Sequence, residues 1–146
     1  NLENRKKARD QLSKGGSIII FPSGTVSTTL KFYEKTKKAF DPEWKKFTSR
    51  LIKQTDPNIV PIYFYGVNSI KFQLASHLGE MFRASLIFHE VKRRIGSEFK
   101  FIVGDSFKYS ELGLDLSNQE LADYLRTKTY LLNSNLIEAP PYGLDI

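Results

Sequence analysis

The chain has no cysteine among its 146 residues, which excludes disulfides, thiolate metal sites and cysteine nucleophiles. It has only two histidines, His77 and His89, so histidine-based metal binding or acid–base catalysis has little material to use. No apolar run reaches the roughly eighteen residues that a membrane-spanning helix needs. The charged opening residues, "NLENRKKARDQ", are unlike a signal peptide, so we expect none in this segment.

Several familiar motifs are also missing. Neither G-x-x-x-x-G-K-[ST] nor G-x-G-x-x-G occurs, so nucleotide binding by these loops is not expected. The hydrolase motif G-x-S-x-G is absent as well. The net charge of +6 favours an anionic partner, which leaves nucleic acid, a phosphorylated ligand and acidic lipid headgroups open. The basic stretch "KRRIG" lacks an aromatic platform, so it predicts a solvated turn rather than a nucleic-acid site.

Helical and strand patterns alternate along the chain. Apolar spacing and end signals predict helices and strands in the following order: helix 2–14, strand 17–21, a helix from about Glu43 carrying Trp44, Phe47, Leu51 and Ile52, strand 59–65 with Pro61 near its start, helices 70–78 and 80–85, strand 99–104, and a helix with Ser117 as N-cap and Glu120 completing a capping box. The order predicts an α/β fold with a mostly parallel or mixed sheet flanked by helices. We expect strands 17–21 and 59–65 to be neighbours, with Phe21 and Trp44 buried.

Neither histidine is placed for catalysis by its surroundings. His77 lies in "ASHLGE" and is predicted to be a residue near a helix end. His89 is followed by Glu90, and on an extended segment adjacent side chains point to opposite faces. We therefore predict no catalytic residue and no metal site in this chain.

Residues 21–27, "FPSGTVS", follow an apolar strand and contain several small hydroxyl residues. This stretch resembles the third signature block of the glycerolipid, or lysophospholipid, acyltransferase family, which usually has the sequence F-P-E-G-T-R-S. Downstream, "DPEW", "IVPIYFYGVNS", "KFQLASHLGEMFRASL" and "FKFIVGDSF" occur in the order found in the family's hemolysin-like branch, related to lyso-ornithine-lipid acyltransferases. The resemblance implies that residues 1–110 are the second half of a partial acyltransferase domain, with a helix and irregular tail, 111–146, packed on it.

The resemblance also implies a function for the loop. Acyl transfer in this family uses a His as general base and an Asp that orients it. A fatty acyl group passes from acyl-CoA or acyl carrier protein to a lyso-lipid hydroxyl, without a cofactor or metal. The acceptor would be held by the loop residues Phe21, Pro22, Ser23, Gly24, Thr25 and Ser27. A plain turn with hydroxyls capping backbone groups is the alternative interpretation of the same residues.

This sequence departs from the family pattern in two ways. Ser23 replaces the usual glutamate and Val26 the usual arginine, which favours an acceptor without a glycerol phosphate. The catalytic His, followed five positions later by Asp, is absent, because Phe82 and Arg94 occupy those positions after His77 and His89. By the resemblance, the motif belongs upstream of residue 1, so this chain alone is expected to be inactive.

The expected partners follow from charge and from the resemblance. We expect a cytoplasmic protein, peripheral on the membrane, whose basic surface meets an anionic membrane face or an acidic carrier protein. If half of the domain is missing, uncovered strands and helix faces should cause self-association. Two alternatives remain open: a non-catalytic lipid- or partner-binding module of the same fold, and a basic nucleic-acid-binding domain, although we expect no nucleic acid as partner.

Overall fold

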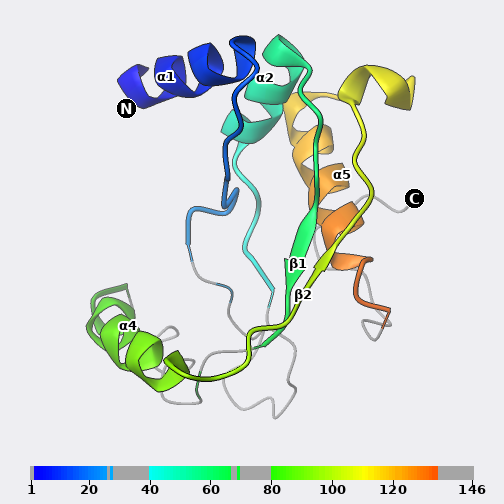
Figure 1. Ribbon diagram of the computed structural model, residues 1–146. Helices are drawn as coiled ribbons and strands as arrows, with labels where there is room; N and C mark the ends of the chain where they lie inside the picture. Colours follow the sequence, from blue (N-terminus) through cyan, green and yellow to red (C-terminus); the bar gives the residue numbers. More distant parts are fainter. Residues whose placement is uncertain (1, 26, 28–39, 67–68, 70–79, 135–146) are drawn as a thin grey trace. The chain divides into compact units, whose positions relative to one another are not determined.

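The computed structural model describes residues 2–25, 27, 40–66, 69 and 80–134. Its helices and strands, in chain order, are α1 (Leu2–Ser13), α2 (Lys46–Thr55), β1 (Ile62–Phe64), α4 (Glu80–Arg94), β2 (Phe101–Val103), the short 3-10 helix η1 (Tyr109–Leu112) and α5 (Asn118–Tyr130) (Figure 1). They belong to two compact units. Unit 1 comprises residues 1–24, 43–63 and 102–146, and unit 2 comprises residues 25–42 and 64–101.

The protein is mixed α/β, as predicted, but its described sheet is small. β1 and β2 form a two-stranded sheet. The Tyr65 amide donates to the Lys100 carbonyl at 2.9 Å, and the Gly104 amide donates to the Pro61 carbonyl at 2.9 Å, which is an antiparallel register. Within the described residues there is no parallel strand pair, so the predicted parallel sheet between layers of helices is not seen there.

A one-residue bulge follows β2. Ile59 and Phe107 form an antiparallel bridge in which each amide donates to the other carbonyl, at 2.8 and 3.1 Å. This pair is one residue out of the register set by Pro61 and Gly104, so the segment after Gly104 carries one extra residue. Gly104 itself leaves no room for a side chain, since a Cβ there would lie 2.8 Å from Leu132 and 2.9 Å from Pro61.

The segment 17–21 differs from its predicted state. It is extended, but among the described residues it pairs with no strand, so the expected neighbourhood with strand 59–65 is wrong there. Ile19 is 86% exposed and Phe21 is 70% exposed, so the prediction that Phe21 is buried is also wrong. Alternate residues, Ile18 and Ile20, are half-buried. An extended segment covered on one side only accounts for this alternation.

The second helix begins later than predicted. α2 starts at Lys46, three residues after Glu43, because Lys45 keeps an extended backbone with φ −76° and ψ 135°. Trp44 therefore precedes the helix, yet it is buried as expected. The helix ends where Asp56 adopts a left-handed backbone with φ 39° and donates its amide to the Ile52 carbonyl.

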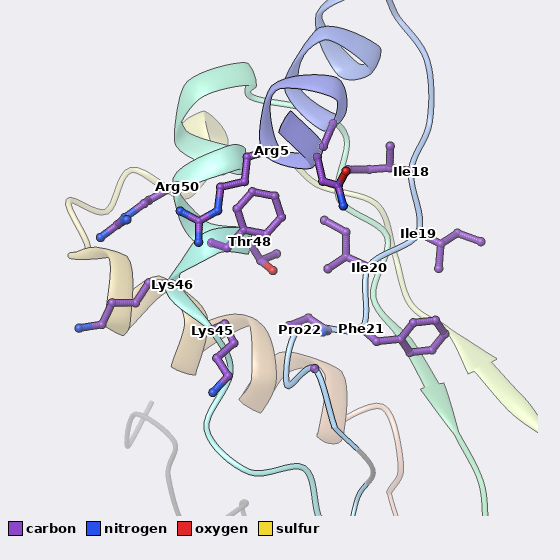
Figure 2. Close-up of a pocket in the computed structure, with 14 residues that line it drawn as sticks. Arg5, Ile18, Ile19, Ile20, Phe21, Pro22, Lys45, Lys46, Thr48 and Arg50 are labelled. Atoms are coloured by element: carbon purple, nitrogen blue, oxygen red, sulfur yellow. The ribbon is translucent and has the colours of Figure 1, made fainter. Parts of the chain in front are cut away.

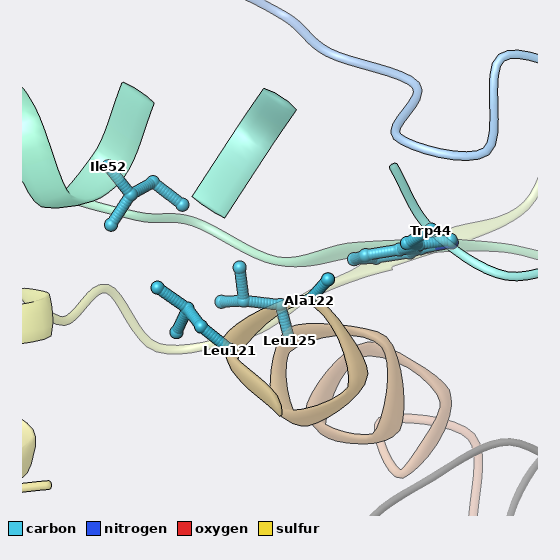
Figure 3. Close-up of a cluster of buried hydrophobic side chains, with 5 residues drawn as sticks. All are labelled: Trp44, Ile52, Leu121, Ala122 and Leu125. Atoms are coloured by element: carbon cyan, nitrogen blue, oxygen red, sulfur yellow. The ribbon is translucent and has the colours of Figure 1, made fainter. Parts of the chain in front are cut away.

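The core of unit 1 lies where α2 packs against α5. Five buried apolar side chains form it: Trp44, Ile52, Leu121, Ala122 and Leu125 (Figure 3). The start of α5 is fixed by the predicted capping box, in which the Glu120 amide donates to the Ser117 hydroxyl and the Ser117 amide donates to the Glu120 carboxylate. Tyr130, at the end of α5, meets the ring of Tyr63 on β1 edge to face, with centroids 5.7 Å apart.

In unit 2, α4 is longer than predicted. It continues past Ser85 to Arg94, so the "KRR" of the expected turn forms the last turn of a helix. The chain turns after that, where the Ser97 amide and hydroxyl both donate to the Arg94 carbonyl. The predicted helix 70–78 lies outside the described residues. Among the described helices, none has both the length and the apolar character to cross a bilayer.

The α2–α5 packing predicts which leucine the fold needs. Leu121 is fully buried, so Leu121→Ala should remove apolar contacts and leave a cavity, lowering the free energy of unfolding by about 2–5 kcal/mol. Leu131, near the other end of the same helix, is 59% exposed, and Leu131→Ala should change it by less than about 0.5 kcal/mol. Chemical denaturation followed by Trp44 fluorescence measures both. Equal losses in the two variants would contradict the described core.

Candidate functional site

The loop singled out in the sequence forms a tight turn at the edge of unit 1. The Gly24 amide donates to the Phe21 carbonyl at 3.1 Å, which closes the turn over residues 21–24. Gly24 has a left-handed backbone, φ +68°, which a residue with a side chain adopts only at a cost. The Lys45 amide donates to the Pro22 carbonyl at 3.0 Å, which ties the turn to the residue before α2.

This turn forms one wall of an open hollow in unit 1, which we call the basic hollow. Its volume is 810 Å³, and α1, the extended segment before the turn, and the first turns of α2 surround it (Figure 2). Ile20 points into the hollow, whereas Ile19 and Phe21 point away from it. The lining residues are Asn4, Arg5, Ala8, Ile18, Ile19, Ile20, Phe21, Pro22, Gly24, Lys45, Lys46, Phe47, Thr48 and Arg50.

Four cationic residues surround the hollow, and none of its lining residues is acidic. Arg5 comes from α1, Lys45 precedes α2, and Lys46 and Arg50 belong to α2. The guanidinium of Arg5 lies 5.5 Å from the centroid of the Phe47 ring, a cation–π contact. An isoleucine-rich wall beside four positive charges suits an anionic amphiphile, whose apolar part can lie on the wall while its charged group meets the cations.

The six predicted site residues divide between the two compact units. Phe21, Pro22 and Gly24 line the basic hollow, whereas Ser23 is only 3% exposed and is not among the lining residues. Thr25 and Ser27 belong to unit 2, where the Ser27 hydroxyl donates to the Asp41 carboxylate. The hydroxyls therefore act in part within the fold, which agrees with the interpretation of the loop as a capped turn.

Sequence reasoning missed the cations of the hollow. They come from two segments about forty residues apart, and no spacing rule connects Arg5 with Arg50. The available signals were the net charge of +6 and the basic pattern of residues 2–14. Packing of α1 near α2 converts this general charge into a local cluster.

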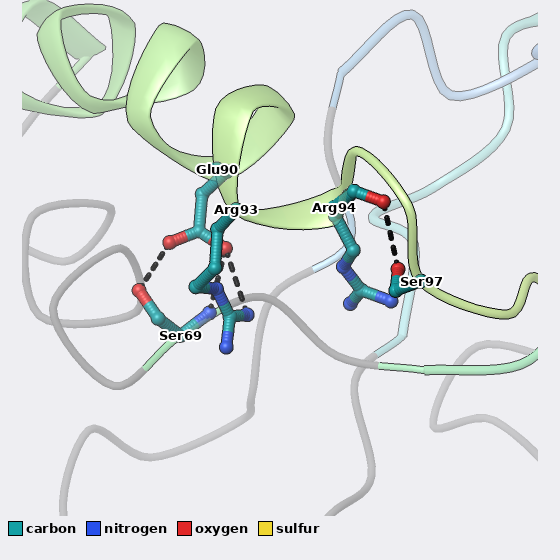
Figure 4. Close-up of polar contacts among 5 residues, drawn as sticks. All are labelled: Ser69, Glu90, Arg93, Arg94 and Ser97. Carbon is teal, nitrogen blue, oxygen red and sulfur yellow. Dashed lines mark hydrogen bonds and ion pairs between the residues drawn. The ribbon is translucent and has the colours of Figure 1, made fainter.

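The described histidine lies in unit 2, outside the basic hollow. His89 is an exposed residue of α4, and His77 lies outside the described residues. Glu90, next to His89, has a structural role. Its carboxylate accepts hydrogen bonds from the Ser69 amide at 3.0 Å and from the Ser69 hydroxyl (Figure 4). Arg93, one turn along α4, contacts the same carboxylate at 3.1 Å. Within the described ranges, no group of three or more His, Asp or Glu side chains is arranged to hold a metal ion.

The Glu90 contacts predict a pH dependence. Burial alone would raise the pKa of Glu90, but the bonds from Ser69 and Arg93 outweigh it and hold the pKa below the ordinary value of 4.5. Because the folded pKa is lowered, the stabilising contribution is complete above pH 4.5 and disappears as the pH falls through the folded value. Between about pH 6 and about pH 3, the wild type should lose more stability than Glu90→Gln.

Denaturant unfolding followed by circular dichroism measures this difference. Asp56 and Glu120, whose pKa values are lowered by bonds from Ser110 and Ser117, titrate in both proteins and cancel. Glu98→Gln is the matched control, since the Glu98 side chain is 85% exposed, and it should keep the wild-type slope. A Glu90→Gln slope equal to that of the wild type would contradict the role given to this carboxylate.

Comparison with known proteins gives no match among protein-family models, curated proteins or solved structures.

Proposed function

We propose that this chain is part of a membrane-associated acyltransferase, which transfers a fatty acyl group from a thioester donor to a lyso-lipid hydroxyl. The observation that carries the proposal is the coincidence of two independent features. The turn 21–24, which resembles the family's third block, also lines a hollow with an apolar wall and four cations. The proposal requires a surface suited to a lipid at the loop that was identified from the sequence.

In this proposal, the residues of the chain bind and orient. The apolar wall at Ile18 and Ile20 receives an acyl chain, and Lys46 and Arg50 meet an anionic group of the donor or the acceptor. Acyl-CoA carries phosphates and an acyl carrier protein has an acidic surface, so either donor suits this charge. The four cations also make acceptors with a phosphate group suitable, because they supply the positive charge that the family's usual arginine, here Val26, does not.

Proton transfer is the step that this chain does not provide. An acceptor hydroxyl attacks the thioester when a positioned base removes its proton, and the family's His and Asp perform that role. By the resemblance, these two residues lie upstream of residue 1. The proposal therefore includes a larger sheet between helices, completed by a segment outside the printed sequence.

The second candidate is a non-catalytic lipid-binding module. It is favoured by the lack of a His followed five positions later by Asp in the printed sequence. The basic hollow would then bind a lipid without any reaction. The two candidates share the binding site, so only an activity measurement separates them.

Exposed apolar residues support self-association as a further part of the proposal. In unit 1, Ile19 is 86% exposed. In unit 2, Phe64, Phe99 and Phe101 are 41%, 62% and 55% exposed and form a ring cluster with centroids 5.3 and 6.1 Å apart. Aromatic groups of this kind on a surface are typical of faces that a partner, here an upstream segment or a second copy, would cover.

The basic hollow predicts charge-dependent lipid binding. Lys46→Ala with Arg50→Ala should weaken binding of acyl-CoA by about tenfold, because charge-assisted bonds to phosphate are lost. Lys6→Ala is the control, since Lys6 is an exposed residue of α1 that does not line the hollow. Isothermal titration calorimetry at low and high salt measures both. Unchanged affinity in the double variant, or an equal loss in the control, would exclude the hollow as the binding site.

The absence of the family's catalytic His and Asp predicts that this chain alone is inactive. The purified chain should give only background acyl transfer with acyl-CoA or acyl carrier protein and lyso-lipid acceptors, since a positioned base contributes about 10²- to 10⁴-fold. Turnover should appear when the protein also contains the upstream segment. If the chain alone turns over and His77→Ala or His89→Ala abolishes it, the active site is elsewhere. Lipid binding without turnover in the longer protein would favour the non-catalytic module.

A further inference from the structure

Helix α4 exposes an apolar stripe to solvent. The stripe consists of Ile87, Phe88, Val91 and Ile95, which are 41%, 81%, 58% and 77% exposed. Val91 lies one turn after Ile87, and Ile95 lies one turn further, just beyond the end of the helix, so these side chains follow one face. A surface helix normally turns its apolar stripe toward the core, whereas these four side chains face solvent.

Basic residues make up the end of α4, and one of them borders the stripe. At about 100° per residue, Lys92 lies about 40° from Phe88, whereas Arg94, about 20° from Ile87 on the other side, is half-buried with its guanidinium beside Gly66. Lys92, Arg93 and Arg94 make up the last turn of α4. Lys92 and Arg93 are exposed, and Lys100, a few residues after the helix, has a side chain that is 74% exposed and lies 3.6 Å from the Glu98 carboxylate.

The acidic residue of this part of α4 faces the body of unit 2. Glu90 is the only Asp or Glu between Leu86 and Ile95, and it is only 4% exposed. Its carboxylate receives the Ser69 amide and hydroxyl, and Arg93 pairs with it (Figure 4). These bonds fix the rotation of the helix about its axis. The exposed face thus carries apolar groups and positive charge, with its single negative charge withdrawn.

We propose that the α4 stripe is a membrane-docking surface that inserts into the headgroup region of an anionic phospholipid bilayer. An exposed apolar stripe bordered by Lys92, with the Glu90 carboxylate withdrawn, matches the two attractions of such a bilayer. Phe88 and Ile95 enter the apolar boundary, while Lys92 reaches the phosphates along its own methylene chain. This deepens the membrane association included in the proposed function by naming the element responsible.

The proposal is tested by vesicle sedimentation with the full chain. The chain should bind vesicles of equal parts phosphatidylcholine and phosphatidylglycerol, and bind phosphatidylcholine vesicles at least tenfold more weakly. Phe88→Ser with Val91→Ser should reduce binding to the anionic vesicles at least tenfold, because two apolar side chains that enter the bilayer are lost. The matched control is Leu114→Ser with Leu131→Ser, two leucines that are 48% and 59% exposed in unit 1, and it should bind as the wild type does.

Charge is tested in the same assay. Lys92→Glu should weaken binding to anionic vesicles several-fold. Lys6→Glu on α1 should weaken it less, because Lys92 borders the stripe and Lys6 does not. Equal binding to neutral and anionic vesicles, or equal effects of the paired variants, would overturn the proposal. Light scattering without lipid gives another outcome that would overturn it. If the wild type self-associates and Phe88→Ser with Val91→Ser does not, a second copy of the chain covers the stripe.

A tryptophan at position 88 reports insertion directly. The chain has one tryptophan, Trp44, which is buried in the core of unit 1 and should not be quenched by brominated lipid. Phe88→Trp in a Trp44→Phe background should shift its emission to the blue on anionic vesicles and be quenched. Binding without quenching at position 88 would show that another surface docks. No acyl transfer is measured, so the proposed chemistry and this inference can fail separately.

Discussion

The contact of α2 with α5 is the constraint on which unit 1 depends. Both helices are short, and neither is long enough to be stable alone in water, so their shared apolar face has to hold them. That face also positions the site. α2 carries Lys46 and Arg50, and its preceding residue, Lys45, holds the turn at Pro22, so the basic hollow keeps its form only while α2 stays packed against α5.

Local signals predicted the helices well and the sheet poorly. The capping box at Ser117 and Glu120 uses only neighbouring residues, so the start of α5 could be derived from sequence alone. Trp44 is buried as predicted, although the helical spacing behind that prediction placed it inside a helix that begins only at Lys46. Strand pairing depends on distant partners, and an apolar run such as 17–21 has the same composition whether it is paired or half-exposed. For α4, "KRR" resembles a turn, but the helix continues through it to Arg94.

Part of the loop predicted from the sequence lines the basic hollow, and its role in binding stays a prediction. Pro22 and the left-handed Gly24 line the hollow, whereas Ser23 is buried and does not line it. Charge surrounds it instead, brought together by packing of α1 near α2. A sequence gives the number of cations, whereas their distribution over a surface depends on tertiary contacts. The resemblance to acyltransferases remains a hypothesis about this surface.

The division of unit 1 into three separate segments has a consequence for synthesis. A ribosome releases α1 and α2 well before it releases α5, with residues 64–101 of unit 2 between α2 and α5. Until Leu125 leaves the exit tunnel, the apolar faces of Trp44 and Ile52 have no permanent partner. A nascent chain of this protein therefore carries an uncovered apolar helix while the segment between Thr55 and Leu125 is made, a state in which chaperones bind and in which pauses favour aggregation.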